Sequence, residues 1–496
     1  MQLSARASRQ LAHTLRLTAL SRLAKALALQ FPTSRVYLVG GYLRDLIMGH
    51  DSKDIDLVVS GVTARNLERF LRRVGTVNLV GRTFGVFKFI PKHKTVPAID
   101  IALPRRERAF GTGGYRDVAV QSDWKLPIEE DLSRRDFTMN ALAWDLLTHK
   151  LIDPFGGERD IHARRVRAVG KAEVRFKEDY SRMLRALRFA CQLDFTVEPK
   201  TWRALAASIT RINATRAGER VVPYEIIAKE LLKAFCANPP CAFDLFDTSG
   251  ATKVLMPELI PMKRCPQPRA YHREGDVWTH TRLALAVLAG SRFAKEFGSA
   301  PNAEVVMAVL FHDIGKPRTI VMPKARGERI RFDGHDKIGA QMACRISERL
   351  RLSSYKDERI DVDAERLAWL VGHHLLLISG DPRAMRATTI ERHYLRDRRL
   401  GDALLALQFA DGSATIGANG ASALREYRAM RKRIATLLGT RRLTLPPPLL
   451  NGHDIMRVVH LQPGPEVGQA LHRLREAQLS GKVKTRHEAL TFIKRV

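Results

Sequence analysis

The sequence contains little cysteine and no long apolar run. Its five cysteines are spread over 496 residues without a CxxC pair, which argues against both a zinc ribbon and the disulfide framework of a small secreted protein. No apolar stretch reaches the roughly 20 residues that span a bilayer, and two histidines interrupt the candidate at 367–378. We therefore expect a soluble, cytoplasmic protein with reduced thiols and no membrane partner.

Acidic residues are also scarce. The chain has 52 Asp and Glu against 83 Lys and Arg, a formal net charge of +31, which favours a polyanion such as nucleic acid as a partner. A basic surface kept for solubility is the alternative. Residues 1–44 contain no acid at all, which is compatible with an organelle transit peptide or with an amphipathic helix at 11–29 packed behind the first strand.

The hydrophobic pattern changes along the chain. Strand-like segments occur at 36–39, 55–59, 86–90 and 96–102, whereas after residue 160 the period becomes helical, as at 176–193, 201–209 and 223–236. Proline-rich breaks at 256–268 and 445–448 separate further helical blocks. We therefore divide the chain into a basic extension (1–34), a mixed α/β domain (35–165), a helical neck (166–262), a histidine-rich helical block (263–415) and a helical tail (416–496).

Three carboxylates in the mixed domain have a pattern that suits magnesium. Asp54 and Asp56 flank Ile55 at the start of a strand, so that both face one side of the sheet. Asp100 lies in an apolar strand segment, where an unpaired charge would be expensive. Oxygen ligands suit Mg²⁺, and the alternatives are a solvated turn for the pair and a salt bridge for Asp100. Gly40 and Gly41, between the first strand and a helix, would let the backbone approach a phosphate.

Two further segments place polar residues at helical spacing. We expect residues 131–141 to begin a helix that presents Arg135, Asp136 and Asn140 to a triphosphate and ribose. Asp179 and Arg182 are three apart and would share a helical face. A carboxylate beside a guanidinium matches the amino donor and ring-nitrogen acceptor of C and A, whereas U and G reverse that arrangement. A surface ion pair is the alternative for either segment.

Taken together and in order, these motifs resemble the class II tRNA nucleotidyltransferases and bacterial poly(A) polymerases. The resemblance rests on LVGG at 38–41 with Arg44 and Asp45, the DxD at 54–56, RRDFTxNA at 134–141, DPFGG at 153–157 and EDxxR at 178–182. It implies an α+β protein with a polymerase-β-like nucleotidyltransferase head, a springy element at 153–157 and an all-α neck, HD domain and tail. Arg44 and Arg185 would join the nucleotide-binding residues.

The histidine-rich block resembles an HD phosphohydrolase domain. Its candidate ligands are spread along 131 residues but share one chemistry, since mixed imidazole and carboxylate sets tolerate transition metals; they are His280, His312, Asp313, His335, His373, His374 and Asp411. One or two divalent metals would be held, and the sequence does not decide between His373 and His374. The resemblance implies phosphatase or phosphodiesterase activity on RNA ends, and a relic site kept for structure is the alternative.

The family resemblance favours one activity. The segment 80–88 is similar to CCA-adding enzymes rather than poly(A) polymerases, and 105–126 is long enough for a flexible loop, which argues against a CC-only enzyme. We expect CCA addition to tRNA from CTP and ATP, by two-metal attack of the RNA 3′-hydroxyl on the α-phosphate. Poly(A) or A-only addition, an HD hydrolase with an inactive head, and an RNA-binding protein with both sites dead are the alternatives. The oligomeric state is not indicated.

Overall fold

The chain folds into two compact units in a computed structural model that describes residues 5–50, 54–79, 86–92, 97–114, 117–357, 359–378, 380–418, 420–439 and 445–495. Side chains are not described at 5–16, 79, 108, 109 and 118. The first unit holds residues 1–234 and 245–255, and the second holds 235–244 and 256–496. Among the described residues, no helix has both the length and the apolar character needed to cross a bilayer.

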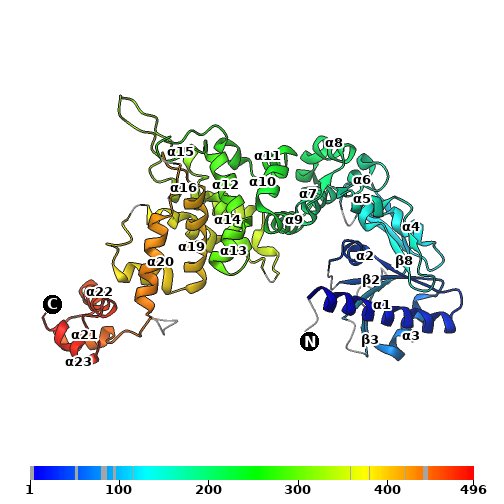
Figure 1. Cartoon of the computed structure of the whole chain (residues 1–496), viewed down its shortest axis with the longest axis horizontal. Helices are drawn as coiled ribbons and strands as arrows, with labels where there is room; N and C mark the ends of the chain where they lie inside the picture. Colours follow the sequence, from blue (N-terminus) through cyan, green and yellow to red (C-terminus); the bar gives the residue numbers. More distant parts are fainter. Residues whose placement is uncertain are drawn as a thin grey trace. The chain divides into compact units, whose positions relative to one another are not determined.

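A mixed seven-stranded sheet organises the first unit (Figure 1). Its order is β3-β4-β5-β2-β1-β8-β9, and within the described part of this sheet only the central β2–β5 pair is parallel. The strands are β1 (Arg35–Val39), β2 (Ile55–Ser60), β3 (Gly75–Leu79), β4 (Val86–Pro91), β5 (Ile99–Ala102), β8 (Ala143–Asp145) and β9 (Leu151–Ile152). The predicted strands are confirmed, except that β5 begins at Ile99 and Val96 lies outside the described residues.

One face of this sheet is covered by a helix over only part of its width. On one face, Tyr37, Val39 and Val58 pack against Ile128 and Leu132 of α4 (Ile128–Ser133). This cover ends before β4 and β5, whose Lys88 and Asp100 pair in register and are exposed on that same face. The polar end of the face is therefore open to a ligand.

Helices and short ribbons complete the first unit. The predicted N-terminal helix is confirmed: α1 runs from Ala5 to Gln30 and buries Leu20, Ala24 and Leu27. The other helices are α2 (Gly40–Ile47), α3 (Ala64–Val74), η1 (Thr138–Asn140), α5 (Gly157–His162), α6 (Ala172–Glu178), α7 (Ser181–Leu193), α8 (Pro199–Ser208), η2 (Ile209–Asn213), α9 (Tyr224–Ala237) and α11 (Ala251–Leu255), with α10 (Pro239–Thr248) passing between the units. Two-stranded ribbons are β6 (Arg105–Ala109) with β7 (Val118–Ser122), β10 (Arg165–Val166) with β11 (Thr196–Val197), and β12 (Thr215–Arg216) with β13 (Glu219–Arg220).

The second unit is helical. Four of its helices begin at side-chain caps supplied by Asp276, Asn302, Asp363 and Asp397, each accepting a hydrogen bond from the backbone N–H three residues on. The elements are η3 (Pro257–Met262), α12 (Val277–Ala289), α13 (Ser291–Phe297), α14 (Ala303–Phe311), α15 (Lys316–Thr319), α16 (His335–Arg349), η4 (Leu352–Ser354), α17 (Ala364–His373), η5 (His374–Leu377), α18 (Ala387–Ile390), the π-helical turn η6 (Glu391–Leu395), α19 (Arg398–Ala414) and α20 (Arg425–Leu438). A separate core at the C-terminal end joins α21 (Gly452–Val459), α22 (Pro465–Leu479) and α23 (Arg486–Ile493).

Three predictions about local structure are wrong. The segment 131–141 does not begin a helix: α4 ends at Ser133, Phe137 is extended, and a single 3-10 turn follows. The expected helix at 176–193 is broken at Asp179, which is extended between α6 and α7. The expected flexible loop at 105–126 is not a loop throughout, because Arg105–Ala109 and Val118–Ser122 pair as the β6–β7 ribbon.

Candidate active site and metal centre

A cavity of about 730 Å³ lies in the first unit, where α2, β2 and the start of α7 meet. It is predominantly polar. Nearly all the nucleotide-site residues expected from the sequence line it: Gly40, Gly41, Arg44, Asp54, Asp56, Arg135, Asp136, Asn140, Asp179, Arg182 and Arg185. Asp100 is the exception.

Gly40 brings the β1–α2 turn against the Asp56 carboxylate. Its φ is +76°, and a Cβ at this position would lie 2.8 Å from Asp56 Oδ2. Any other residue would be strained and would press on the carboxylate. Because Val39 and Asp56 are partners in the β1–β2 register, the backbone N–H groups at the start of α2 face the same space as the acid.

The three carboxylates share one face of the sheet. Asp56 and Asp100 are direct partners in parallel β2 and β5, and Asp54 lies just before β2 on the same side. Burial raises the pKa of Asp56 to about 6; Arg135 opposes the rise, and Asp100 and Asp54 add to it. The expected burial of Asp100 is wrong, because β5 exposes it on the open part of the sheet. Buried Asp56, with Asp54 and Asp100 beside it on the same face, therefore marks the place where a cation would be stabilised.

A chain of polar contacts joins α2 to α7 across the cavity. Arg44 Nη1 donates to Asn140 Oδ1 at 2.9 Å, and Asn140 Nδ2 donates to Asp136 Oδ1 at 3.3 Å. Arg185 donates from Nε and Nη2 to Asp136 Oδ2 at 2.8 and 2.5 Å. Burial alone would raise the pKa of Asp136, but the Arg185 ion pair outweighs it and lowers the value to about 2. Asp136 is therefore ionised and held in place at neutral pH.

Asp179 and Arg182 reach the cavity from the break between α6 and α7. They do not share a helical face as expected, because Asp179 precedes α7 and accepts the Ser181 N–H at 2.8 Å. Arg182 is held by Glu178 Oε2 at 2.6 Å, while its Nε lies 4.0 Å from Asp179 Oδ2. Their side chains are only 16% and 12% exposed. The donor and acceptor edges are thus adjacent, fixed and nearly dry.

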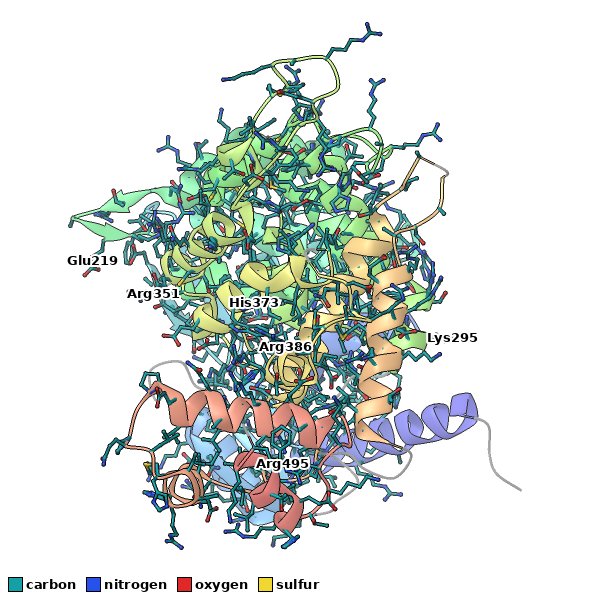
Figure 2. All side chains as sticks on the ribbon, turned by 90° about the vertical axis from the view of Figure 1, so that its left-hand side faces the viewer. Glu219, Lys295, Arg351, His373, Arg386 and Arg495 are labelled. Atoms are coloured by element: carbon teal, nitrogen blue, oxygen red, sulfur yellow. The ribbon has the colours of Figure 1, made fainter. Side chains whose placement is uncertain are left out.

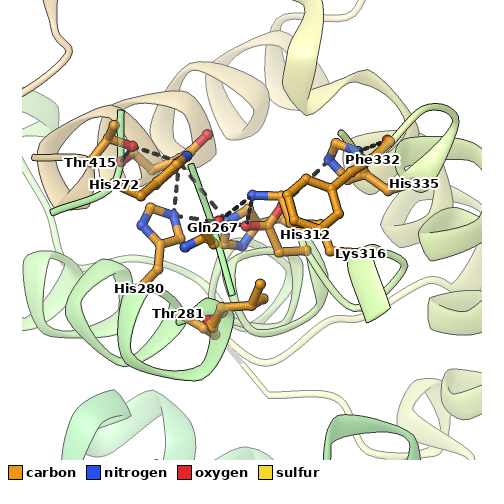
Figure 3. A network of polar contacts seen from close by, with 12 residues as sticks. Gln267, His272, His280, Thr281, His312, Lys316, Phe332, His335 and Thr415 are labelled. Carbon is orange, nitrogen blue, oxygen red and sulfur yellow. Dashed lines mark hydrogen bonds and ion pairs between the residues drawn. The ribbon is translucent and has the colours of Figure 1, made fainter. Parts of the chain in front are cut away.

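In the second unit, imidazole and carboxylate groups from four helices and one turn converge in the interior (Figure 3). His280 of α12, His312 after α14 and Asp411 of α19 form one group of ligand atoms within 4.8 Å of one another. A second such group contains Asp313, His335 and His374. His312 Nε2 lies 3.3 Å from Asp313 Oδ2, so the two groups are adjacent.

Three histidines of this cluster use Nδ1 to hydrogen-bond to a backbone carbonyl. His312, His335 and His374 use Nδ1 to contact Val309 O, Phe332 O and Val371 O at 2.7, 2.7 and 2.6 Å. A carbonyl only accepts, so Nδ1 carries the proton and Nε2 keeps its lone pair. The lone pairs of His335 and His374 face each other at 3.3 Å, and buried His312 Nε2 has no hydrogen-bond partner in the part of the chain described.

Two charged side chains support these ligands. Lys316 Nζ donates to Asp313 Oδ2 at 2.7 Å and to Gln267 Oε1 at 2.8 Å. Buried Glu274 accepts from both His272 and His280 Nδ1, at 2.7 and 2.9 Å. Burial alone would raise the pKa of Glu274, but these two contacts lower it to about 2. The imidazole of His280 is correspondingly more basic: against the effect of burial, Asp411 and Glu274 raise its pKa to about 9.

Models of three known domain families match three separate parts of the chain. Residues 36–167 match the poly(A) polymerase head domain, 277–414 the HD domain, and 446–493 a putative second domain of tRNA nucleotidyltransferases. The A-adding tRNA nucleotidyltransferase of Deinococcus radiodurans is 34% identical over 388 residues, which cover 76% of this chain and 82% of that protein. The chain belongs to the tRNA nucleotidyltransferase family.

Other members extend the likeness. The multifunctional CCA protein of Stenotrophomonas maltophilia is 38% identical over 293 residues, covering 58% of this chain and 65% of that protein. Among solved structures, the CCA-adding enzyme of Bacillus stearothermophilus in complex with CTP has the same fold, with a TM-score of 0.63 at 22% identity and 97% of each chain covered. As a tRNA nucleotidyltransferase, the chain has the expected α+β fold, with a nucleotidyltransferase head and an α-rich HD region.

In this tRNA nucleotidyltransferase, the predicted HD ligands converge with one exception. His373 does not join the cluster: its Nδ1 contacts Trp369 O, and its ring stacks on Trp369 with centroids 4.3 Å apart. It lies on the outside of the unit, as Figure 2 shows. His374, one residue later, begins the next turn and is buried, so of the two adjacent histidines it is His374 that lies in the cluster.

Sequence reasoning missed the residues that act through another side chain. The sequence pattern assigns no role to Glu274, Gln267, His272 or Lys316. The signal for Glu274 is weak in sequence, since besides His272 and His280 it accepts from the backbone N–H of Ile416, 142 residues away. The segment 80–88, used above to separate subfamilies, lies outside the described residues except for 86–88.

Both sites suit divalent cations, but to different degrees. In the HD region, ligand atoms already lie within 4.8 Å of one another, and an orphan Nε2 and two facing lone pairs call for a cation. In the head, the all-oxygen set and the raised pKa of Asp56 fit Mg²⁺. Within the described residues, however, the head carboxylates form no group as tight as those of the HD region. A metal in the head would therefore draw its ligands together.

Proposed function

We propose that this nucleotidyltransferase adds nucleotides without a nucleic-acid template to the 3′ end of tRNA, completing CCA from CTP and ATP. One observation carries the proposal: the acids of β2, the glycine turn and the Asp179–Arg182 pair all line a single cavity. Nucleotide-transfer groups and a base-reading pair are thus within reach of one bound triphosphate. The solved relatives of similar fold include a Thermotoga maritima CCA-adding enzyme complexed with tRNA.

The chemistry is an in-line displacement. The RNA 3′-hydroxyl oxygen forms a bond to the α-phosphorus of the incoming nucleotide, the bond to the β-phosphate breaks, and pyrophosphate leaves. Two Mg²⁺ ions, one held by Asp54, Asp56 and Asp100 and the other by Asp54 and Asp56, would lower the pKa of the hydroxyl and neutralise phosphate charge. The triphosphate would meet Arg44, Arg135 and the N–H groups after Gly40.

Arg135 offers a donor for this role. Its Nη1 and Nη2 are used by Asn140 O and Asp131, both at 3.2 Å. Its Nε is buried and has no partner among the described residues. A buried unpaired donor costs about 1–3 kcal/mol, which an anionic ligand would recover. Asp136 and Asn140, linked to Arg44 and Arg185, would position the ribose.

The distinguishing experiment supplies tRNA lacking its terminal CCA with single and mixed nucleoside triphosphates. CCA addition predicts two C residues with CTP alone, a further A when ATP is added, and no extension by UTP or GTP. Long A tracts would instead identify a poly(A) polymerase.

A-only addition is the second candidate, and one finding favours it. The A-adding relative of Deinococcus radiodurans aligns over 82% of its own length. An A-only enzyme would leave a tRNA lacking CCA unchanged in CTP and ATP, but would extend a tRNA that already ends in CC. Running both substrates side by side therefore decides between the two activities.

We further propose that the HD region hydrolyses phosphate esters at RNA 3′ ends. The buried cluster opens into a cavity of about 740 Å³ lined by Asp313, His335, His374 and Asp411. Water would attack phosphorus, the ester bond would break, and the ribose hydroxyl would take a proton as phosphate leaves. A divalent metal bound there would generate the nucleophile. Release of phosphate from 3′-phosphorylated RNA, abolished by His312→Ala but not by Asp56→Asn, tests the assignment.

A further inference from the structure

The HD cavity has a dry floor and an exposed rim. The ligands Asp313, His335 and His374 at its floor are buried, whereas Tyr271 and Ile378 on its lining are 52% and 71% exposed. Cations are also present at the rim, including Arg329 and Arg425. An aromatic ring and guanidinium groups around a metal-binding floor suit a nucleotide with a terminal phosphate.

A basic hairpin begins at this rim. Residues 321–331 leave and rejoin the fold through a two-way backbone pairing of Val321 with Arg331, at 2.9 and 3.1 Å. We call this segment the 321–331 hairpin; it projects from the helical unit between α15 and α16 in Figure 1. The chain enters it five residues after Lys316 and leaves it four residues before His335. His335 is a ligand of the floor, and Lys316 donates to the floor residue Asp313.

The hairpin lies on the surface, outside the helical core. Every residue from 321 to 329 is exposed, including Val321 and Met322 at 38% and 53%. Its basic residues are Lys324, Arg326, Arg329 and Arg331, against a single acid, Glu328. Glu328 is engaged by the Lys324 backbone N–H at 2.8 Å. Exposed cations held away from any core are available to a polyanion.

One contact ties the hairpin to the cavity. Arg329 Nη1 donates to the Tyr271 hydroxyl at 3.0 Å, and its guanidinium lies 5.5 Å from the Tyr271 ring centroid. Arg329 and Tyr271 both line the cavity, whereas Lys324 and Arg326 lie beyond its lining. In the described part of the chain, neither of these two side chains makes a hydrogen bond or ion pair. The tip lies up to about 16 Å from the base, at roughly 3.3 Å per residue.

We propose that the 321–331 hairpin binds the sugar–phosphate backbone of single-stranded RNA whose 3′-terminal phosphate enters the HD cavity. A mononucleotide fits inside a cavity of this size and would not meet Lys324 or Arg326. Only a substrate that continues out of the cavity reaches those cations. The hairpin thus makes the HD region selective for RNA ends over free nucleotides. The turnover measurement described below depends on the HD activity proposed above, whereas the RNA-binding measurement does not.

The test compares the full-length protein with Lys324→Ala/Arg326→Ala. A matched variant, Lys295→Ala/Lys432→Ala, removes the same charge from exposed positions on α13 and α20; Lys295 points outward in Figure 2. Binding of a dye-labelled single-stranded RNA with a 3′-phosphate is measured over a series of salt concentrations without metal. Turnover of that RNA and of adenosine 3′-monophosphate is measured with a divalent metal.

We expect the hairpin variant to lose RNA affinity on the order of tenfold and its slope of log K against log salt to fall by about 1.4, since each single-strand phosphate contact contributes about 0.7. The KM for adenosine 3′-monophosphate should stay within about twofold, and the matched variant should resemble the wild type. An unchanged salt slope, or the same loss in the matched variant, would overturn the proposal and leave an acidic protein partner as the hairpin's ligand. If the wild type releases no phosphate from either substrate, the HD activity fails while the salt slopes still decide on the hairpin.

Discussion

Arg185 of α7 donates two hydrogen bonds to one carboxylate oxygen of Asp136, which lies 49 residues earlier in the sequence. Asp136 is 8% exposed, and its other oxygen accepts the Phe137 N–H and the Asn140 side chain. The sequence segment expected to carry the triphosphate-binding residues is therefore locked to the helix expected to read the base. A shift of α7 would change both functions together.

Breaking this pair should destabilise the first unit. Arg185→Gln leaves Asp136 charged and buried, and we expect a loss of about 3–5 kcal/mol in the free energy of unfolding. Asp136→Asn in the same chain should recover part of it, with a coupling energy of about 1–3 kcal/mol by denaturant titration of the four proteins. The exposed Arg164–Asp194 pair, 3.5 Å apart, is the control and should show no measurable coupling. Equal coupling in both pairs would refute the role assigned to burial.

Asp56 should make the metal-free protein less stable at neutral pH. Its folded pKa is raised to about 6 from an ordinary value of 3.8, so the folded state keeps a proton that the unfolded chain has lost. Stability then falls as pH rises through the window from about 4 to 6, by about 3 kcal/mol in full. In EDTA, Asp56→Asn should melt higher than wild type at pH 8, with the gap closing at pH 4.

Magnesium supplies the second arm of this experiment. Because the cation binds the ionised wild-type cluster, Mg²⁺ should raise the wild-type melting temperature and narrow the gap at pH 8. A gap that is the same at pH 4 and pH 8, or that Mg²⁺ does not change, would show that Asp56 is not held for a metal.

Base choice should depend on the Asp179–Arg182 pair. Asp179→Ala or Arg182→Ala removes one hydrogen-bonding partner of the incoming base, and each lost contact is worth about 1–3 kcal/mol. We expect the preference for CTP over UTP, measured as the ratio of kcat/KM, to fall about 5- to 150-fold. Glu178→Gln, which weakens the support that Glu178 gives to Arg182 and Arg175, should have a smaller effect. A variant that slows CTP and UTP incorporation equally would assign the pair to structure alone.

The adjacent histidines give a matched test of the HD centre. His374→Ala removes a buried Nε2 from the Asp313–His335–His374 group and should weaken divalent-metal binding at least tenfold by calorimetry. His373→Ala removes a ring stacked on Trp369 and should leave metal affinity unchanged. Weakened metal binding in His373→Ala, with unchanged binding in His374→Ala, would mean that His373 and not His374 is the ligand.

The parts of the head that could be predicted depend on local pattern. Alternation in a strand is enough to place Asp54 and Asp56 on one side, and the Gly40–Gly41 turn needs only its neighbours. The helix predicted at 131–141 was wrong because Asp136 accepts hydrogen bonds from the Phe137 N–H and from Arg185, which is distant in sequence. Those contacts hold the chain extended where propensity alone favours a helix.

The features of the HD centre that could not be predicted from the sequence depend on tertiary contacts. The candidate histidines could be named from the resemblance to an HD domain, but only packing shows that His374, and not His373, lies in the cluster. Glu274 contacts His280 of α12 and the backbone N–H of Ile416, two residues after the end of α19, and no sequence spacing predicts these contacts. The same holds for Gly315: a Cβ there would lie 2.2 Å from His335 O, a requirement visible only once α15 and α16 meet.

The most direct test of the central claim measures labelled CTP and ATP incorporation into tRNA lacking CCA by three proteins. Asp56→Ala should reduce the single-turnover rate by about a thousandfold or more, since it removes a ligand of the transition-state cations. His312→Ala, which damages only the HD centre, should incorporate at the wild-type rate. Full incorporation by Asp56→Ala would contradict the assignment of nucleotide transfer to the head cavity.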